Sequence, residues 1–304
     1  MAHKTAKLTR LWRKLRWFFT VYMWAPHDAT IMTKNGLLSF NSRDRTLGRS
    51  LHLDREFEFD GMLKTVELLQ ENHYLPADLT QATVMDVGGY VGMISIGFVH
   101  AGVFGRAIAF EPNPNNYRLL QKNLAQNNVE NKITAYNMAL SDRKETLTME
   151  LSEKNFGDHR IRESDSGQIE DHYGESGRKT INVEAETLDE VMSRQESSQT
   201  ENIALVWMDI QGHEGKFFKG ARSFFLQHKH VPVAMEFWPY GIRRSGMEKD
   251  EFCNLLKGLF QKFYILDEEK PLSRDIQNID AYFERFNAPD SGAHLILVND
   301  RVTP

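Results

Sequence analysis

Residues 82–112 read ATVMDVGGYVGMISIGFVHAGVFGRAIAFEP, and this stretch decides the fold of the chain. Apolar runs at 82–85 and 106–110 flank a glycine-rich turn and a second apolar segment at 93–101. The order of strand, glycine turn, helix and strand is that of one βαβ unit, which takes roughly 30 residues. The stretch therefore predicts two parallel strands, the second of which ends at Glu111.

The turn between these strands indicates a nucleoside cofactor. Its glycines allow a ligand to approach the backbone closely, and the next helix begins with free N–H groups. Glu111 can accept hydrogen bonds from both hydroxyls of a ribose. Asp86, ahead of Gly88 and Gly92, suits the cationic S-adenosylmethionine (SAM) better than an anionic pyrophosphate. Val87 stands where the dinucleotide fingerprint requires glycine, which disfavours NAD; a turn without any ligand is the other alternative.

Five motifs follow one another along the chain: DVGGYVG at 86–92, AFEPNP at 109–114, NMALSD at 137–142, TLDE at 187–190 and MDIQGHE at 208–214. They echo the patterns D-V-G-A-N-x-G, A-F-E-P-x-P, A-L-S-D, T-L-D-E and K-I-D-V-E-G-x-E. On these motifs the chain resembles the FkbM-like family of SAM-dependent methyltransferases over about residues 36–240. Each motif is weak alone, and the five together are specific.

The resemblance implies that SAM binds at the turns that follow the first three strands. Tyr90 stands where the family has a small polar residue, so its ring could stack on the ligand or narrow the pocket. The expected cofactor-binding residues are Asp86, Gly88, Gly89, Tyr90, Gly92, Glu111, Pro112, Asn113, Met138, Ala139 and Ser141.

The fold class that we expect is α/β, a Rossmann-like class I methyltransferase with a seven-stranded, mostly parallel sheet and helices on both faces. The strands are expected at 82–85, 106–110, 133–140, 203–210, 231–237, 263–266 and 294–298, the last two as an antiparallel hairpin, with an extra strand at 146–151. Three segments are expected: a basic N-terminal helical extension at 1–35, a lead-in cap at 36–80 and the methyltransferase domain at 81–304.

Catalytic residues are expected where the fourth and fifth strands end, because ligands in such sheets lie at the carboxyl ends of the strands. Asp209 and Glu236 fall there, and His213 begins the next helix. Methyl transfer to a hydroxyl needs a base, and an ordinary histidine has a suitable pKa. His213 is therefore the expected base and Asp209 the group that orients it or the acceptor, with Glu236 and His159 as alternative bases. Alternatively, neither residue takes part in the reaction: Asp209 only caps the next helix, and His213 lies on the surface.

A metal ion is a further possibility at this place. Asp209, Glu236 and a third ligand could hold a divalent cation that polarises a hydroxyl. The histidines of the polar stretch 153–180 do not have metal-ligand spacing, so we predict no metal site.

The polar stretch 153–180 predicts a long loop, either a lid over the substrate or a solvated insertion. Its NFGDHR segment resembles an N-x-G-x-x-R pattern of the family, which favours the lid. Asn155, His159 and Arg160 are accordingly the expected substrate-binding residues.

The resemblance implies an O-methyltransferase that acts on a sugar, a glycan or a small secondary metabolite. The alternative is a degenerate SAM-binding module that works as a partner protein without turnover. A net charge of -5 disfavours nucleic acid as a partner. A single cysteine, Cys253, fits a reducing compartment, so a cytoplasmic location is expected, with a peripheral place at the inner face of the membrane as a possibility.

Residues 1–25 carry six Lys and Arg side chains and no acid, and their apolar residues recur at helical spacing. The apolar stripe consists of Leu8, Leu11, Trp12, Leu15, Phe19 and Tyr22. This pattern predicts a basic amphipathic helix suited to an anionic membrane surface. Packing on its own domain or on a second subunit of a homodimer is an equal alternative, and a cleaved signal or transit peptide is less favoured.

Overall fold

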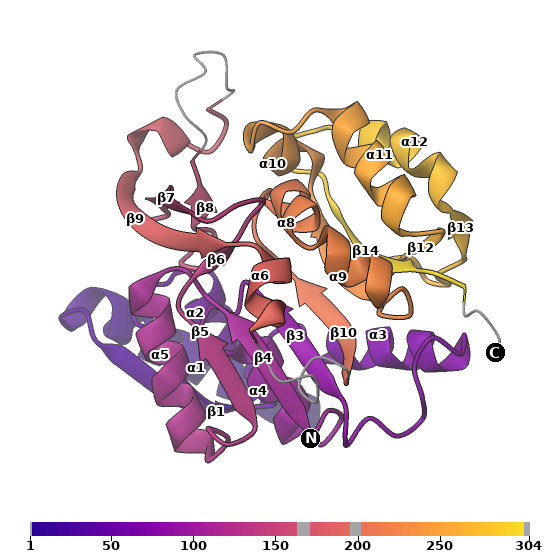
Figure 1. Ribbon diagram of the computed structural model, residues 1–304. Helices are drawn as coiled ribbons and strands as arrows, with labels where there is room; N and C mark the ends of the chain where they lie inside the picture. The colour runs from indigo at the N-terminus through magenta and orange to yellow at the C-terminus, as the bar shows by residue number, and fades with distance from the viewer. Residues whose placement is uncertain (1, 163–170, 195–201, 301–304) are drawn as a thin grey trace.

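The computed structural model describes residues 2–162, 171–194 and 202–300, and Figure 1 shows their arrangement. A large central sheet has the strand order β13-β12-β14-β11-β10-β3-β4-β5. Its strands are β3 (Thr83–Val87), β4 (Arg106–Phe110), β5 (Ile133–Tyr136), β10 (Ile203–Met208), β11 (Val233–Phe237), β12 (Lys262–Ile265), β13 (Arg274–Asp275) and β14 (Ala293–Val298).

The strand order reverses between β3 and β10. Strands β3, β4 and β5 follow one another in one direction, and β10 and β11 continue on the other side of β3, all in parallel. Strand β14 is antiparallel to β11 and β12. A ligand crevice is expected at such a reversal, outside the carboxyl ends of the strands. The expected Rossmann-like α/β sheet is thus confirmed, with eight strands instead of seven in its described part, because the two-residue β13 is too short to show a sequence pattern.

The strands are apolar on both faces because helices cover both. Val84 faces one apolar cluster, whereas Met85 and Val87 face the other. The first face is covered by α1 (Ala2–Phe18), α2 (Leu47–Asp54), α3 (Phe59–Glu71), α4 (Met93–His100) and α5 (Pro114–Asn127). The second is covered by α6 (Leu188–Ser193), α8 (Glu214–Gly220), α9 (Arg222–Gln227), α11 (Lys249–Leu259) and α12 (Ile279–Arg285). Cys253 is buried in α11.

A hairpin of β1 (Asp28–Thr33) and β2 (Gly36–Asn41) spans the expected segment boundary at residue 35. Its outer edge docks on α5 through asparagine side chains. The Oδ1 atoms of Asn123 and Asn127 accept the backbone N–H groups of Ser39 at 2.7 Å and Leu37 at 2.9 Å. The side-chain amides thereby take the place of a neighbouring strand and hold the hairpin in one register.

The expected third strand, 133–140, is divided. Strand β5 ends at Tyr136, and β6 (Ala139–Leu140) joins a second sheet with β7 (Glu145–Leu151), β8 (Arg160–Ile161) and β9 (Lys179–Glu186). Between them, Asn137 Nδ2 donates to the carbonyl of Glu111 at 2.8 Å and turns the chain. The polar stretch expected as a loop therefore contains β8, a 3-10 turn at Glu175–Gly177 and the start of β9, while its residues 163–170 lie outside the described residues.

Helix α1 continues into a π-helical turn at Phe19–Met23. Trp17 and Val21 are buried against the domain, and Arg13 donates to the carbonyl of Leu53 at 2.8 Å. Within the described part of the chain, no helix has the length and apolarity to cross a bilayer. Helix α10 (Pro239–Arg244) follows β11, and a 3-10 turn at Ile276–Asn278 precedes α12.

Candidate active site

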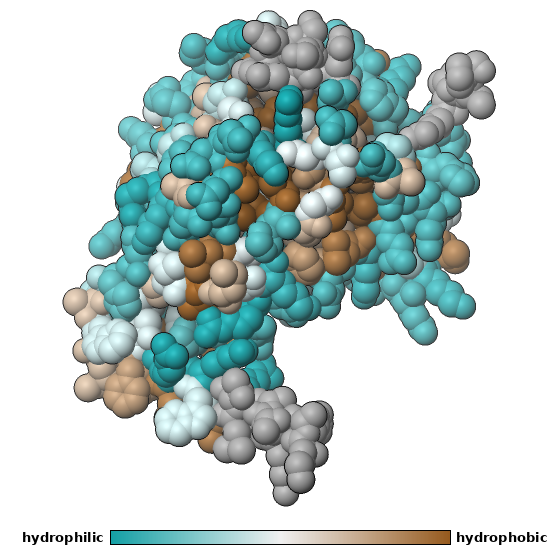
Figure 2. All heavy atoms as spheres, turned by 90° about the horizontal axis from the view of Figure 1, so that it is seen from below, coloured by the Kyte–Doolittle hydropathy of each residue, from teal (hydrophilic) through white to brown (hydrophobic). Residues whose placement is uncertain are grey.

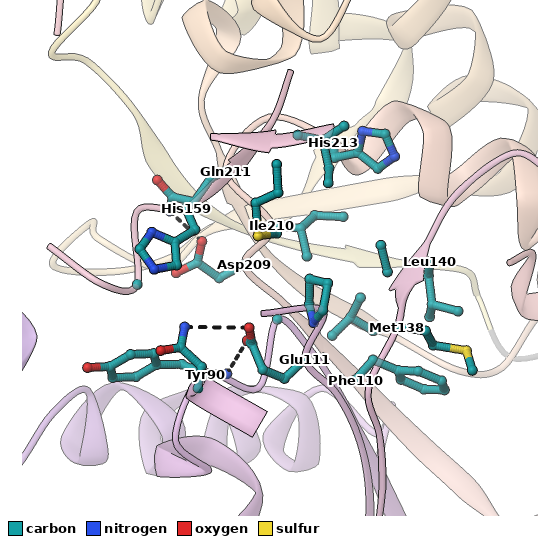
Figure 3. Close-up of a pocket in the computed structure, with 18 of the residues that line it drawn as sticks. Tyr90, Phe110, Glu111, Met138, Leu140, His159, Asp209, Ile210, Gln211 and His213 are labelled. Atoms are coloured by element: carbon teal, nitrogen blue, oxygen red, sulfur yellow. Dashed lines mark hydrogen bonds between the residues drawn. The ribbon is translucent and has the colours of Figure 1, made fainter. Parts of the chain in front are cut away.

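A cleft lies at the carboxyl ends of β3, β4 and β10, where the strand order reverses, and Figure 3 shows its lining. It encloses about 570 Å³ of empty space, its open mouth included. This size is in the range of sites for small molecules and cofactors. Six of the expected cofactor residues line it: Gly88, Tyr90, Glu111, Pro112, Met138 and Ala139.

The turn after β3 has no space for a side chain at two of its glycines, Gly88 and Gly92. Gly88 has φ +94°, and a Cβ atom there would lie 2.0 Å from the carbonyl oxygen of Asp209. Gly92 has φ +88°, and its Cβ would lie 2.6 Å from Leu120. Only glycine adopts these angles without strain and leaves the space that the turn needs.

Asp86 lies behind the turn and does not line the cleft. Its Oδ2 accepts the backbone N–H of Ser95 at 3.0 Å, in the first turn of α4. Burial raises the pKa of Asp86 to about 6. The structure thus shows Asp86 organising the turn. Among the other expected cofactor residues, Gly89, Gly92, Asn113 and Ser141 are also outside the lining.

Glu111 is held by backbone amides at the edge of the cleft. Its Oε2 accepts the N–H of Tyr90 and its Oε1 the N–H of Asn113, both at 2.8 Å. The Nδ2 of Asn116 makes a further, long contact with Oε1 at 3.5 Å, which a ligand hydroxyl can replace, so the two oxygens can still receive two ligand hydroxyls. The side chain is 5% exposed, and burial raises its pKa to about 8.

Tyr90 has φ +46°, and its hydroxyl donates to Oδ2 of the buried Asp44. Burial raises the pKa of Asp44, which also accepts the N–H of Thr46 at 3.0 Å. This contact ties the lead-in segment to the glycine turn and fixes the Tyr90 ring along the cleft. Asp44 was not expected as a site residue, since nothing in its local sequence names a partner 46 residues away.

One side of the cleft is apolar. Phe110, Met138, Leu140 and Ile210 line it, and Phe110 stacks on Tyr136 with ring centroids 5.1 Å apart. Together with the hydroxyl-accepting Glu111, this surface can hold a flat base next to its sugar.

The opposite side of the cleft is polar and is organised by Gln211. Its Nε2 donates to Asp209 Oδ1 at 2.6 Å and to Glu236 Oε2 at 2.8 Å. Burial and the neighbouring Asp209 raise the pKa of Glu236 well above its usual range. Asp209 lines the cleft, and it also lines, with Glu236 and Glu58, a smaller cavity behind it. Within residues 2–162, 171–194 and 202–300, no group of three His, Cys, Asp or Glu side chains is placed to hold a metal ion.

His213 lines the cleft on its apolar side. Its Nε2 is 3.1 Å from the hydroxyl of Ser141, the residue after Leu140, and its Nδ1 has no hydrogen-bond partner among the residues that the structure describes. Burial lowers the pKa of His213 to about 4, with the Lys216 charge as a second cause. Figure 3 shows the ring on the far side of the cleft from His159.

His159 is the one expected substrate residue that lines the cleft; Asn155 and Arg160 do not. The backbone N–H of Ser152 donates to His159 Nδ1 at 3.0 Å. Because a backbone amide can only donate, the neutral ring carries its hydrogen on Nε2 and offers it as a donor. Burial lowers the pKa of His159 to about 4, so the ring is neutral at physiological pH. The neighbouring Phe156 also lines the cleft.

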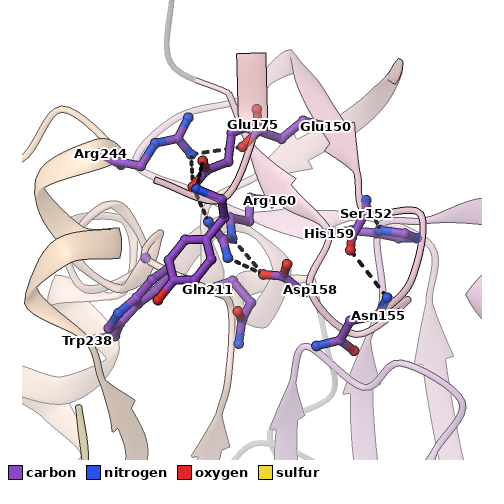
Figure 4. Close-up of polar contacts among 12 residues, drawn as sticks. Glu150, Ser152, Asn155, Asp158, His159, Arg160, Glu175, Gln211, Trp238 and Arg244 are labelled. Carbon is purple, nitrogen blue, oxygen red and sulfur yellow. Dashed lines mark hydrogen bonds and ion pairs between the residues drawn. The ribbon is translucent and has the colours of Figure 1, made fainter. Parts of the chain in front are cut away.

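Arg160 belongs to a buried ion network, drawn in Figure 4. Its guanidinium donates to Glu175 at 2.6 Å and to Asp158 at 2.7 Å and lies over the Trp238 ring at 4.5 Å. Arg244 donates to Glu150 at 2.9 Å in the same network. These contacts fasten the segment that carries His159 to α10 and β7, so Arg160 acts on the cleft only through that segment.

One family model matches most of the chain. The methyltransferase FkbM domain matches residues 86–285. A crystal structure of methyltransferase FkbM from Methylobacillus flagellatus is 16% identical with a TM-score of 0.42, covers 82% of this chain, and is matched over 52% of its own length. This chain thus spans about half of that protein.

Two further solved structures are similar. A putative transferase from Pyrococcus horikoshii is 10% identical, with a TM-score of 0.40 and coverage of 89% of this chain and 70% of its own. A putative tRNA methyltransferase from Streptococcus pneumoniae, in complex with S-adenosyl-L-methionine, is 12% identical, with a TM-score of 0.37 and coverage of 79% and 75%. No curated protein matches the chain. The match of the domain over most of the chain shows that this protein belongs to the methyltransferase FkbM domain family.

Proposed function

We propose that this protein transfers the methyl group of SAM to a hydroxyl group of a sugar, a glycan or a small metabolite. The observation that carries the proposal is a single cleft with a nucleoside-like cradle at one end and a carboxylate at the other. Glu111 belongs to the first end and Asp209 to the second. Membership of a methyltransferase family supports the class of reaction.

The residues at the cofactor end fit SAM. Glu111 would accept the two ribose hydroxyls, and the apolar side with Phe110 and Met138 would hold the adenine. Gly88 lets the turn lie against the end of β10, and its backbone lines the cleft where the amino-acid part of the ligand would lie. When bound, SAM supplies a methyl group on a positively charged sulfur, which is ready for displacement.

The residues at the polar end can align a hydroxyl and remove its proton. As the new O–C bond forms and the C–S bond breaks, the hydroxyl proton must pass to a base. We assign this role to Asp209, whose carboxylate is held by Gln211. His159 would donate its Nε2–H to the acceptor oxygen and set its direction. Glu236, whose pKa is raised by burial and by the neighbouring Asp209, is a positioning residue that shares Gln211 with Asp209.

His213 is the other proposed base. A pKa near 4 makes its ring a weaker proton acceptor than an ordinary histidine, and Ser141 already occupies its Nε2. We therefore prefer Asp209 and treat His213 as the alternative that a substitution can decide.

The test is SAM binding by calorimetry, followed by release of S-adenosylhomocysteine in the presence of candidate acceptors. The panel contains neutral monosaccharides, oligosaccharides, sugar phosphates and the matching amino sugars, which separates O- from N-methylation. We expect SAM to bind and NAD not to bind, and product to form with hydroxyl acceptors. Failure to bind SAM contradicts the proposal. Binding of SAM without product across the panel favours a partner protein that has lost turnover.

A further inference from the structure

A second, more open cavity adjoins the cleft at His159. It lies between the loop that follows β2, the first turn of α5 and the loop between β7 and β8, and it encloses about 1200 Å³, its open mouth included. Asn116, Phe156 and His159 line both this cavity and the cofactor cleft. We call it the entrance groove, because an acceptor that fills it reaches the cleft beside His159.

The entrance groove is positively charged, although the chain as a whole has a net charge of -5. Arg43, Arg45, Arg118 and Lys179 line it, and Glu153 is the acid that lines it with them. Asp28 pairs with Arg118 through both oxygens, at 2.8 and 3.0 Å. No carboxylate of the described residues is ion-paired with the other three cations. The groove therefore keeps an excess of positive charge.

Two of these cations are held in place by neutral groups. The guanidinium of Arg43 donates to the backbone carbonyls of Val21 and Trp24. The guanidinium of Arg45 lies over the Tyr22 ring, 5.4 Å from its centroid. Carbonyls and aromatic rings orient a cation without cancelling its charge, so both remain able to attract an anion.

We propose that the acceptor carries a phosphate-type anionic group, which the entrance groove binds while the hydroxyl to be methylated reaches Asp209. The proposal rests on the methyl transfer proposed above and names the class of its acceptor. Arg45 and Lys179 would bind the anion directly, and His159 would contact the acceptor where the groove meets the cleft. A soluble sugar phosphate and a lipid-linked sugar phosphate share this chemistry.

The binding test uses pyrophosphate as the probe, with the full chain saturated with S-adenosylhomocysteine. The double variant Arg45→Gln/Lys179→Gln should bind pyrophosphate at least about tenfold more weakly, since two charge-assisted contacts are lost. The matched control, Arg222→Gln/Lys132→Gln, removes the same charge from exposed positions outside the groove and should bind like the parent. SAM affinity should be the same in all three proteins.

The proposal of an anionic acceptor is wrong if the control variant loses as much pyrophosphate affinity as the double variant. It is also wrong if the parent protein binds SAM but not pyrophosphate. Neither result contradicts the proposed methyl transfer. A parent that does not bind SAM overturns the proposed function itself. The source of the anion is then decided by turnover: a soluble sugar phosphate and the same sugar phosphate on a polyprenol in detergent are compared as acceptors, and the double variant should lose activity on whichever is used.

A second inference has an independent basis in the N-terminal helix. The stripe expected from the sequence faces away from the protein: Leu11, Trp12, Leu15, Phe19 and Tyr22 are between 45% and 65% exposed. Phe18, Met23 and Trp24 extend the exposed surface, and Trp17 and Val21 on the other side make the contact with the domain. Figure 2 shows aromatic rings standing out at this end of the molecule.

We infer that this exposed stripe docks on an anionic lipid surface. The opposite side of the helix already packs on the domain, so the exposed stripe is not needed for that contact. Exposed cations such as Lys14 and Arg16 flank the stripe. Aromatic rings enter the interface of a bilayer while the cations contact anionic headgroups. Because Tyr22 and Trp24 contact Arg45 and Arg43, the docked stripe would place the entrance groove beside the lipid surface.

The test is sedimentation with vesicles of phosphatidylcholine alone and with phosphatidylserine added. The parent should bind the anionic vesicles in a salt-sensitive way, and Trp12→Ser/Phe19→Ser should bind at least about tenfold more weakly. The control Leu272→Ser/Leu226→Ser removes exposed apolar side chains elsewhere and should bind like the parent. The proposed membrane docking is wrong if the parent protein does not bind anionic vesicles at low salt. It is also wrong if the parent forms a dimer that Trp12→Ser/Phe19→Ser abolishes.

Discussion

The two ends of the cleft hold their ligand-facing oxygens by different means. At the cofactor end, backbone amides of Tyr90 and Asn113 fix the carboxylate of Glu111. At the acceptor end, a single side-chain amide, that of Gln211, fixes Asp209 and Glu236 together. A backbone donor persists when side chains change, whereas a side-chain donor is lost with one substitution. The cofactor end is therefore sensitive mainly to changes in backbone shape, and the acceptor end to changes in individual side chains.

The largest effect should follow Gly88→Ala. A methyl group there would meet the carbonyl oxygen of Asp209 at 2.0 Å in a backbone conformation that alanine adopts only with strain. We expect SAM affinity to fall by more than about 100-fold, measured by calorimetry, with a lower unfolding temperature. Gly61→Ala is the control, because a Cβ at Gly61 would have no neighbour within 4 Å among the described residues. Unchanged SAM affinity in Gly88→Ala would show that the turn does not contact the cofactor.

Asp209→Asn should have the next largest effect, and this effect should be confined to the turnover rate. The amide keeps the size and the contact with Gln211 while it removes the proton acceptor, so the rate should fall by about 10²–10⁴-fold. SAM affinity should change little. Asp250→Asn, at a side chain that is 83% exposed, is the matched control. Loss of SAM binding or of folding in Asp209→Asn would mean that Asp209 is structural and that the reaction centre lies elsewhere.

A smaller effect is expected from pH at Glu111. Burial raises its pKa from an ordinary 4.5 to about 8, so the free protein holds this carboxyl mostly protonated at pH 7. The same shift means that the carboxyl favours the folded state below pH 4.5 and that this contribution is lost as the pH rises through 8. If the ionised form accepts the ribose hydroxyls, SAM affinity should rise about tenfold between pH 7 and pH 9. Glu111→Gln should bind SAM more weakly and without this pH dependence. A parent with a flat profile over this range would exclude Glu111 as the ionised ribose acceptor.

The smallest effect is expected from His213→Gln. Since the pKa of His213 is lowered to about 4, its titration cannot produce a loss of activity near pH 6.5. We expect turnover to fall by less than about tenfold, mainly through the lost contact with Ser141, and the pH profile between 5 and 8 to keep its shape. A fall of 10²-fold or more with unchanged SAM affinity would restore His213 as the base.

Local pattern found a segment that forms one end of the cleft with its own backbone: Gly88, Tyr90 and Glu111 line the cleft, whereas Asp86 lies behind it. The acceptor end depends on partners far apart in sequence. Arg160 is a basic residue in a polar stretch, and only the fold pairs it with Glu175. Gln211 follows Asp209 by two positions, and this spacing could have indicated that the two side chains lie close together. The left-handed φ of +55° at Gln211 cannot be predicted from the sequence. The short β13 and the break between β5 and β6 leave no periodicity to detect.

The close approach of Gly88 to Asp209 has a consequence for how the two ligands influence each other. With the turn and the end of β10 in contact, a movement of the turn on SAM binding cannot leave the carbonyl of Asp209 where it was. Cofactor and acceptor affinities should then be linked, and by reciprocity each ligand must change the affinity of the other by the same factor. Such coupling would operate in either order of binding and without any moving lid.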